Sequence, residues 1–158
     1  MKKVIVYASK TNTTKECAER IYNEVEGFDL IDLNEKGKHK IDDYDVVVLG
    51  SYFRIARAPK AMRKFVNKNF KKILTKEVYM FCLGNPDSFE KLLEKNYPSK
   101  FIEHLAYRAN FGAKLRIDTA KGYEGTLIAG MLQSYEVEGK EPPTLIEENI
   151  VNFIEKLK

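Results

Sequence analysis

The sequence predicts an α/β protein built on a doubly wound, five-stranded parallel sheet with the strand order 2-1-3-4-5. Short runs of β-branched and apolar residues alternate with segments of helical periodicity, as is typical of βαβ units. Most of these runs are apolar on both faces, as expected of strands that helices cover on either side. The length of 158 residues favours a single domain, residues 1–158.

The predicted strands and helices follow one another in the order that such units require. Strands are expected over residues 3–8, 28–33, 45–50, 78–83 and 105–111. Helices are expected over residues 13–25 and 59–73, around residues 89–93, and over residues 144–157. Thr13 with Glu16, and Thr144 with Glu147, have the spacing of capping boxes at two helix starts. Residues 118–138 contain glycines and are expected to be irregular.

Composition excludes several classes of protein. Apolar residues make up 44% of the chain and charged residues 32%, which is typical of a globular domain and not of a disordered segment. No apolar run approaches the roughly 20 residues that a membrane-spanning helix needs, and the start of the chain lacks the apolar stretch of a signal peptide. Two cysteines, Cys17 and Cys82, do not make a disulfide framework, so a reducing cytoplasm is the expected location.

Positive charge is concentrated in one stretch of the chain. The net charge is +4, yet residues 46–76 contain nine Lys or Arg and no Asp or Glu, which leaves −5 for the remainder. This asymmetry predicts a basic face from Arg54 to Lys76 that attracts a redox partner, an anionic small-molecule substrate or an anionic membrane. The alternative is a solvated helix face without a partner. Nucleic acid is not expected, because Phe65 and Phe70 fall at core-like positions and do not interleave with the cations.

The loop after the first predicted strand is rich in hydroxyl groups. It consists of Ser9, Lys10, Thr11, Asn12, Thr13 and Thr14, and it leads directly into a helix. Hydroxyls and backbone N–H groups at a helix N-terminus suit a phosphate, which the helix dipole also favours. The alternative is that Thr13 only caps the helix. The phosphate-loop and dinucleotide glycine patterns are both absent, which favours the single phosphate of a mononucleotide.

The loops after the third and fourth predicted strands carry groups that suit a flat, electron-rich ligand. The first contains Ser51, Tyr52, Phe53, Arg54 and Ile55, and the second contains Leu83, Gly84 and Asn85. Aromatic rings stack on such a ligand, guanidinium groups bind its carbonyls, and an amide offers both donors and an acceptor. At least one of Tyr52 and Phe53 is expected in the core. The alternative for the second loop is a plain turn with a helix cap.

Together these loops resemble those of a flavodoxin-like FMN protein, through Ser-x-Thr-x-x-Thr at 9–14, the aromatics at 52–53 and Gly-Asn at 84–85. Residues 49–54 and 111–116 are most similar to the flavodoxin-domain family that includes menaquinone-dependent protoporphyrinogen dehydrogenase. The resemblance spans nearly the whole chain and implies a flavodoxin-like three-layer sandwich with FMN as cofactor. The cofactor-binding residues that it implies are Ser9, Lys10, Thr11, Asn12, Thr13, Thr14, Ser51, Tyr52, Phe53, Arg54, Ile55, Leu83, Gly84 and Asn85.

Two departures from the family pattern bear on these expectations. Asn12 stands where the family usually has glycine, and since asparagine tolerates a left-handed conformation, binding is expected to survive. No glycine occurs between Ser51 and Arg57, where flavodoxins often place one beside the flavin. The second departure predicts more two-electron than one-electron behaviour.

Three functions are consistent with these features. The first is an FMN oxidoreductase that oxidises a protoporphyrinogen-like or other anionic substrate with a quinone acceptor, with Arg54, Arg57 and Lys60 binding substrate carboxylates. The second is a non-enzymatic flavodoxin electron carrier, and the third is a flavin-free interaction module. Residues 126–132 form either an apolar docking surface or a short core helix, and peripheral contact with the inner face of the membrane is open. No metal site is expected, since the two histidines are isolated.

Overall fold

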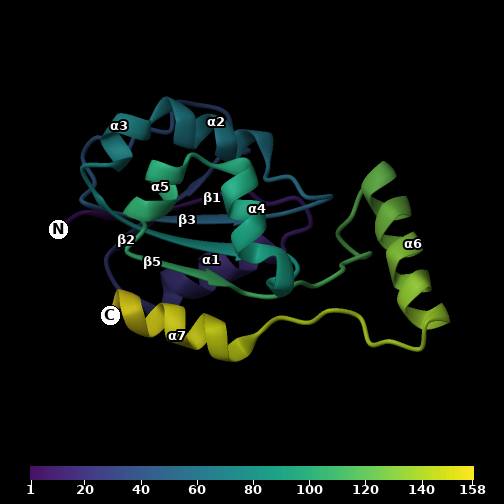
Figure 1. Cartoon of the computed structure of the whole chain (residues 1–158). Helices are drawn as coiled ribbons and strands as arrows, with labels where there is room; N and C mark the ends of the chain where they lie inside the picture. The colour runs from purple at the N-terminus through teal and green to yellow at the C-terminus, as the bar shows by residue number, and fades with distance from the viewer.

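The computed structural model describes residues 1–158 and contains a five-stranded, all-parallel sheet in the order β2-β1-β3-β4-β5 (Figure 1). The predicted fold class and strand order are confirmed. The strands are β1 (Lys3–Tyr7), β2 (Phe28–Asp32), β3 (Val46–Tyr52), β4 (Glu77–Leu83) and β5 (Tyr107–Asn110). In the centre of the sheet Val4 pairs with Val47 and Ile5 with Val48, and all four side chains are fully buried. Both faces of these strands are therefore covered, as their unbroken apolar runs predict.

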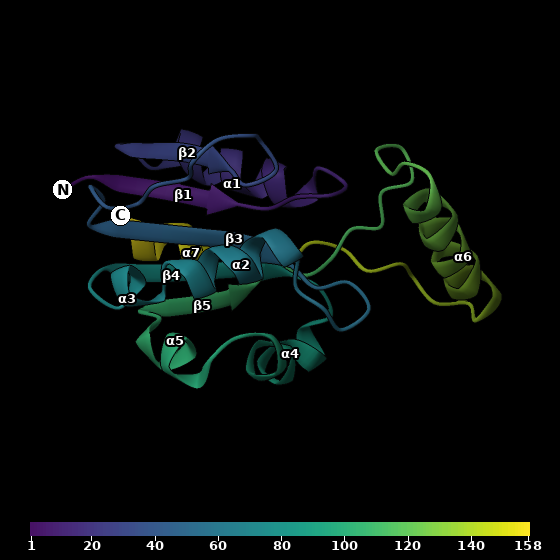
Figure 2. The ribbon, with the colours of Figure 1, turned by 90° about the horizontal axis from the view of Figure 1, so that it is seen from above.

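Helices form a layer on each face of the sheet (Figure 2). One layer consists of α1 (Thr13–Glu24) and α7 (Glu147–Leu157). The other consists of α2 (Lys60–Lys68), α3 (Phe70–Ile73), α4 (Phe89–Asn96) and α5 (Ser99–His104), with a short 3-10 turn, η1 (Pro86–Ser88), before α4. Successive strand residues alternate between the two cores, so Val6 packs with one layer and Tyr7 with the other. None of the helices combines the length and apolar character that crossing a bilayer requires.

The middle of the sheet is packed tightly around an aromatic ring. Phe81 on β4 is fully buried and stacks on Phe111, with ring centroids 4.7 Å apart and planes 7° from parallel. The Phe153 ring of α7 packs against Phe81 in a T-shaped arrangement, with ring centroids 5.8 Å apart and planes at 78°. A Cβ atom at Gly50 would stand 2.7 Å from Phe81 Cε1, so the ring occupies the space that a side chain at position 50 would need.

The capping box predicted at the first helix is wrong. Helix α1 begins at Thr13, so its N-cap is Asn12, which has a left-handed φ of 69° and makes no side-chain capping bond. Glu16 forms an ion pair with Arg116 and does not turn back to the helix start. The Thr13 hydroxyl is left without the role that local sequence predicts for it.

The last helix also starts later than predicted. Helix α7 begins at Glu147 with Ile146 as its N-cap, so Thr144 lies outside the helix. Glu147 instead accepts two hydrogen bonds from the Arg20 guanidinium, at 2.8 and 2.6 Å. The Glu147 carboxylate therefore binds Arg20, which is distant in sequence, and does not form the capping box predicted with Thr144.

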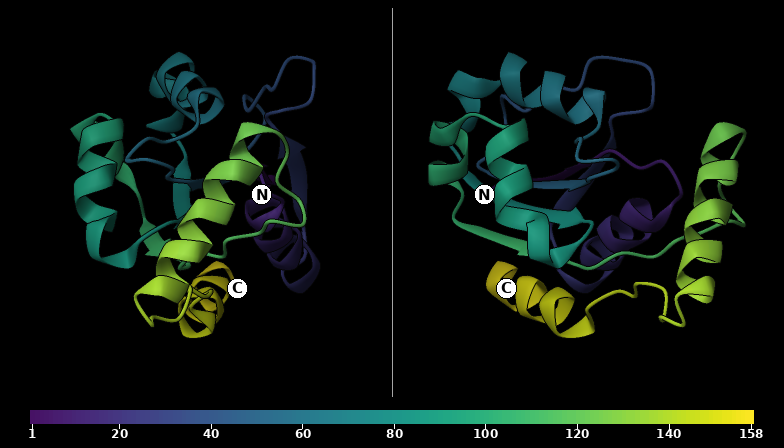
Figure 3. Two further views of the ribbon diagram at one scale, coloured as in Figure 1. Left: turned by 90° about the vertical axis from the view of Figure 1, so that its right-hand side faces the viewer. Right: turned by 45° about the vertical axis from the view of Figure 1, so that its right-hand side comes forward.

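The largest difference from the predictions lies in the segment expected to be irregular. Residues Tyr123–Val137 form helix α6, which stands beyond the carboxyl ends of the strands and covers neither face of the sheet (Figures 1 and 3). The expected short core helix is therefore wrong as well. Only Glu124 and Ile128 of α6 are buried, and the helix lacks the charged outer stripe that would reveal it in the sequence.

The segment that carries α6 leaves and re-enters the body of the protein at one place. The Ala113 N–H donates to the Thr144 carbonyl at 3.3 Å, and the Ile146 N–H donates to the Phe111 carbonyl at 2.9 Å. Gly112 lies between these bonds with φ 80°, and a Cβ atom there would stand 3.0 Å from Ile146 Cγ1. The two ends of this segment, residues 111–113 and 144–146, are called the neck below.

Candidate functional site

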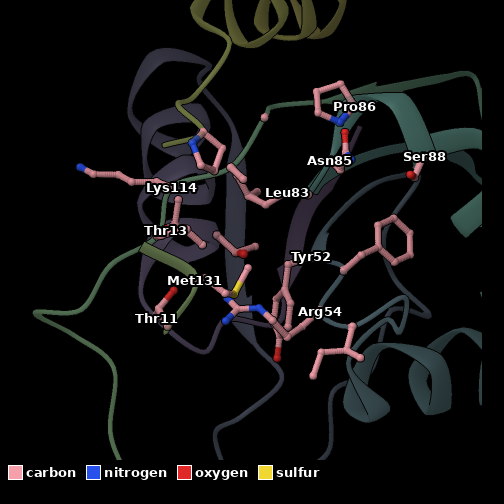
Figure 4. Close-up of a pocket in the computed structure, with 18 of the residues that line it drawn as sticks. Thr11, Thr13, Tyr52, Arg54, Leu83, Asn85, Pro86, Ser88, Lys114 and Met131 are labelled. Carbon is pink, nitrogen blue, oxygen red and sulfur yellow. The ribbon is translucent and has the colours of Figure 1, made fainter. Parts of the chain in front are cut away.

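A pocket of about 590 Å³ lies at the carboxyl ends of β1, β3, β4 and β5, where this strand order predicts a ligand (Figure 4). Its volume is within the range of about 300–1,000 Å³ that is usual for small-molecule sites. The structure brings the three predicted loops together around it. The predicted residues that line the pocket are Lys10, Thr11, Thr13, Thr14, Tyr52, Phe53, Arg54, Ile55, Leu83, Gly84 and Asn85.

Three of the predicted residues do not line the pocket. The Ser9 hydroxyl accepts a hydrogen bond from the Lys15 N–H at 3.3 Å and so supports the loop from behind. Asn12 is exposed and forms the N-cap of α1. Ser51 is fully buried, and its hydroxyl has no hydrogen-bond partner in the chain. Each of these residues shapes a lining loop without facing the space inside it.

The hydroxyl-rich loop presents threonines at the start of α1. Thr11, Thr13 and Thr14 are 6%, 5% and 3% exposed; Thr11 lies in the loop, and Thr13 and Thr14 form the first turn of α1. The Thr13 hydroxyl has no hydrogen-bond partner within the chain. Because the first N–H groups of a helix also lack partners inside the helix, this end of the pocket is a concentrated set of donors.

The two aromatic residues at the carboxyl end of β3, Tyr52 and Phe53, lie in different environments. Phe53 is 9% exposed and belongs to the core, which confirms that at least one of the pair is a core residue. Tyr52 is half-buried at the pocket wall, and burial raises the pKa of its phenol. Tyr52 therefore remains a neutral aromatic surface that a flat ligand can contact.

The tip of the same loop is a tight hairpin. The Arg54 and Arg57 backbones exchange hydrogen bonds at 2.8 and 3.1 Å, with only Ile55 and Ala56 between them. Ile55 and Ala56 have φ values of 53° and 61°, which are left-handed conformations that side chains with a Cβ rarely adopt. The glycine that the sequence lacks here is thus replaced by two strained residues at the rim of the pocket.

The third loop is held rigidly beside the second. The Phe53 N–H donates to the Leu83 carbonyl at 2.8 Å, and the Gly84 N–H donates to the Gly112 carbonyl at 2.8 Å. The Asn85 side-chain oxygen accepts from the Asp87 N–H at 3.0 Å, as in a helix cap. Both interpretations of this loop therefore apply, because Asn85 caps η1 and also lines the pocket.

Helix α6 closes the pocket from the side opposite the sheet, through Met131 and Tyr135. At its first turn the Glu124 carboxylate is 6% exposed and forms an ion pair with Arg54, and a second ion pair joins it to Lys10 Nζ at 3.6 Å. Glu124 thus connects α6 both to the loop after β1, through Lys10, and to the loop after β3, through Arg54. Its role could not be predicted from the sequence, because the segment has no helical pattern that would place Glu124 opposite Arg54.

Residues from the neck and the segment after β5 complete the lining. Lys114 lines the pocket, is exposed and makes no ion pair. Lys114 lies within residues 111–116, whose resemblance to a family motif is the sequence signal that marks it as a candidate pocket residue. The lining residues not predicted from the sequence are Ala56, Pro86, Ser88, Leu92, Gly112, Ala113, Lys114, Leu115, Met131, Tyr135, Pro143 and Thr144.

The arrangement suits ligand binding more than direct catalysis by side chains. No group of three His, Cys, Asp or Glu residues is placed to hold a metal ion. Cys17 and Cys82 are buried, and burial raises the pKa of Cys17 to about 12 and that of Cys82 further still. Neither thiol is therefore an ionised nucleophile near neutral pH. The pocket provides hydroxyl and N–H donors at one end and an apolar, aromatic wall at the other.

Comparison with known proteins gives a consistent picture. A family model described as a flavodoxin domain matches residues 4–133. No curated protein matches the sequence. Among solved structures, a flavoprotein from Lactobacillus acidophilus NCFM in complex with FMN is 16% identical with a TM-score of 0.54, over 69% of this chain and 92% of that one.

Two further solved structures share the fold. The flavodoxin of Streptococcus pneumonia TIGR4 is 15% identical with a TM-score of 0.54, over 99% of this chain and 97% of its own. The WrbA-like flavodoxin of Agrobacterium tumefaciens is 15% identical with a TM-score of 0.56, over 84% of this chain and 98% of its own.

Proposed function

The chain belongs to the flavodoxin domain family, and from that premise we propose that it binds FMN in the pocket at the carboxyl ends of the strands. The observation that carries the proposal is the Thr13 hydroxyl, which is buried at the start of α1 without a partner. A buried hydroxyl that makes no hydrogen bond costs about 1–3 kcal/mol. A phosphate oxygen at the helix N-terminus would accept a hydrogen bond from this hydroxyl and remove that cost.

The residues present fit both ends of FMN. Thr11, Thr13 and Thr14 would hold the phosphate, and Lys10 would add a positive charge at the same end. Tyr52 and Leu83 would contact the isoalloxazine, whose ring edge would meet the free amide hydrogens of Asn85. When bound, the flavin supplies the transfer of electrons or hydride.

Within this family we propose that the protein oxidises an anionic small molecule of the protoporphyrinogen type and passes two electrons and two protons per round to a quinone. The contribution of Met131 and Tyr135 of α6 to the pocket wall, opposite the sheet, supports a small substrate over direct docking of a protein partner. Lys114 is the exposed pocket cation without an ion pair, so it would bind a substrate carboxylate. Arg57 and Lys60, expected in that role, lie outside the lining, and Arg54 is already paired with Glu124.

A quinone acceptor resides in the bilayer, so this activity would take place at the inner face of a membrane, in contact with the cytoplasm. The exposed apolar side chains Ile117, Tyr123 and Val137 lie on the α6 segment and would meet such a surface. Their exposure supports peripheral contact through this segment.

The FMN proposal is tested by titrating the protein into FMN and into riboflavin, which lacks the phosphate, while flavin fluorescence is followed. FMN fluorescence should be quenched in a saturable manner. Thr13→Val should weaken FMN binding about tenfold, since a hydrogen bond to a charged group contributes about 1.5–3 kcal/mol. The same variant should leave riboflavin binding unchanged, and the control Thr126→Val, at an exposed position of α6, should change neither ligand.

Absence of any saturable fluorescence change would contradict FMN binding and would favour the flavin-free interaction module. FMN binding that Thr13→Val does not weaken would contradict the assigned phosphate site.

The oxidoreductase proposal is tested by following porphyrin fluorescence in the presence of protoporphyrinogen, a quinone and the FMN-saturated protein. Lys114→Gln should raise KM for the anionic substrate with little change in kcat, because it removes a contact that substrate and transition state share. Lys121→Gln, outside the pocket on the same segment, is the matched control. FMN binding without turnover would identify the non-enzymatic electron carrier instead.

A further inference from the structure

A second cavity, of about 350 Å³, lies beside α2, where the loop between β2 and β3 approaches it. Five of its 11 lining residues are lysines, and none is an Asp or Glu. Lys38 and Lys40 come from the loop, Lys64 and Lys68 from α2, and Lys72 from α3. The cavity shares no lining residue with the pocket at the carboxyl ends of the strands, so it is a separate site.

The positive charge around this cavity is largely uncompensated. Only Lys72 has a carboxylate partner, Asp42, at 2.9 Å. Two like charges 4 Å apart repel by about 1 kcal/mol in water and by more where the dielectric constant is lower. Lys38, Lys40, Lys64 and Lys68 have no carboxylate partner in the chain, so a bound anion would reduce their mutual repulsion.

The cavity is a formed hollow with an apolar wall. Phe65, which is 6% exposed, contributes to that wall together with Leu33 and Ala61. The facing loop is anchored at both ends, because the Leu33 N–H donates to the Tyr7 carbonyl at 2.9 Å and Ile41 is fully buried. A concave site with cations on one side and apolar groups on the other suits a small organic anion better than a flat acidic protein surface.

We propose that this cavity binds a phosphorylated anion whose phosphate carries more than one negative charge, as a terminal phosphomonoester or a polyphosphate does. Lysine ammonium groups form charge-assisted hydrogen bonds to phosphate oxygens, and five lysines line this cavity. A single carboxylate would leave most of the positive charge unpaired. The same chemistry is offered by a free polyphosphate and by a lipid with a phosphomonoester head group, and the experiment separates these sources.

The site differs from the basic face expected between Arg54 and Lys76. It includes Lys38 and Lys40, which lie outside that stretch, and it excludes both ends of the stretch. Lys76 is only 9% exposed, and its ammonium group donates to the backbone carbonyls of Asp42 and Tyr44 at 3.3 and 2.5 Å. Lys76 is therefore not available to a ligand, and of the lysines and arginines in the stretch only Lys64, Lys68 and Lys72 line this cavity.

The test compares two double variants with equal charge changes. Lys64→Gln/Lys68→Gln removes from the cavity two lysines that are four residues apart in the sequence. Lys91→Gln/Lys95→Gln removes from α4 two exposed lysines with the same sequence spacing. Binding of tripolyphosphate to the full chain is measured by calorimetry at 0.15 M salt, where screening weakens diffuse attraction. In parallel, binding to vesicles of phosphatidic acid is compared with binding to phosphatidylglycerol vesicles of matched charge.

The wild-type protein and the α4 variant should bind tripolyphosphate with equal affinity, and the Lys64→Gln/Lys68→Gln variant at least about tenfold more weakly. The same dependence seen only with phosphatidic acid would support the proposal with the lipid as the source of phosphate. If both double variants bind tripolyphosphate equally weakly, the attraction is one of diffuse charge and the proposal is overturned. The same holds if Lys64→Gln/Lys68→Gln weakens binding to phosphatidylglycerol vesicles as much as binding to phosphatidic acid vesicles. Absence of binding to both tripolyphosphate and phosphatidic acid would also overturn the proposal.

Discussion

Replacing Glu124 with glutamine should free α6 from the loops that it contacts while leaving the sheet intact. The side chain keeps its size, but the ion pairs with Arg54 and Lys10 lose their negative partner. Removing one member of a buried ion pair costs about 3–5 kcal/mol. Arg54 is 21% exposed and Lys10 is 56% exposed, so solvent screening reduces that figure here.

The Lys10 pair, mostly in solvent, contributes at most about 1 kcal/mol, and the better buried Arg54 pair contributes most of the remainder. We therefore expect the free energy of α6 opening to fall by about 2–3 kcal/mol. A change of 1.4 kcal/mol corresponds to a factor of ten, so opening should become about 30- to 150-fold more frequent. The effect is expected to be local, because both ion-pair partners, Arg54 and Lys10, lie in loops outside the strands.

The assay is native-state hydrogen exchange read by mass spectrometry. Amides of α6 should lose protection by the factor given above, while amides of β4 should exchange as in the wild-type protein. Glu136→Gln, at an exposed position of α6 that forms no ion pair, is the matched control. If α6 exchanges equally fast in wild-type and Glu124→Gln protein, the ion pairs do not hold the helix over the pocket and the reasoning fails.

Three further predictions concern stability. Gly50→Ala should lower the free energy of unfolding by about 1–3 kcal/mol in urea titrations, because its Cβ would meet the Phe81 ring; Phe81→Leu in the same chain should restore part of the loss, and full additivity would contradict the packing argument. Ile55→Asn/Ala56→Gly should raise the free energy of unfolding by about 1–2 kcal/mol, and with it the urea midpoint, since both positions have left-handed backbone conformations. A lower midpoint would show that the turn is not strained. Burial raises the pKa of Cys17 from 9.0 to about 12, so its contribution to stability is complete below pH 9 and is lost as the pH rises toward 12; Cys17→Ala should flatten that decline, and an unchanged slope would contradict it.

The fold could be predicted from the sequence because local pattern and tertiary environment agree in the sheet. The runs that form β1 and β3 are apolar apart from Lys3 and Ser51, and the structure buries both of their faces. Helix α5 was not predicted, since its six residues are too few for a periodic pattern. Helix α6 was not predicted because its glycines and its largely apolar circumference hide the face that covers the pocket.

The candidate site could be predicted only as far as the strand order places loops side by side. Lys10, Tyr52 and Asn85 come from three loops that the parallel sheet must bring together at one edge. Contacts that arise from the segment after β5 could not be inferred, because nothing local specifies where that segment travels. The ion pair of Glu124 with Arg54 is such a long-range contact. The pairing of Glu16 with Arg116 is another, and the Thr13 hydroxyl is left without a partner.

The neck bears on how the chain tolerates changes in its length. Since Gly112 and Leu145 form a backbone bridge at its base, residues 114–143 make an excursion whose two ends are adjacent in space. Lengthening such an excursion is inexpensive in conformational entropy, because closure grows only with the logarithm of its length. Changes in the length of residues 114–143 should therefore alter the pocket wall that α6 provides more than they alter the folding of the sheet.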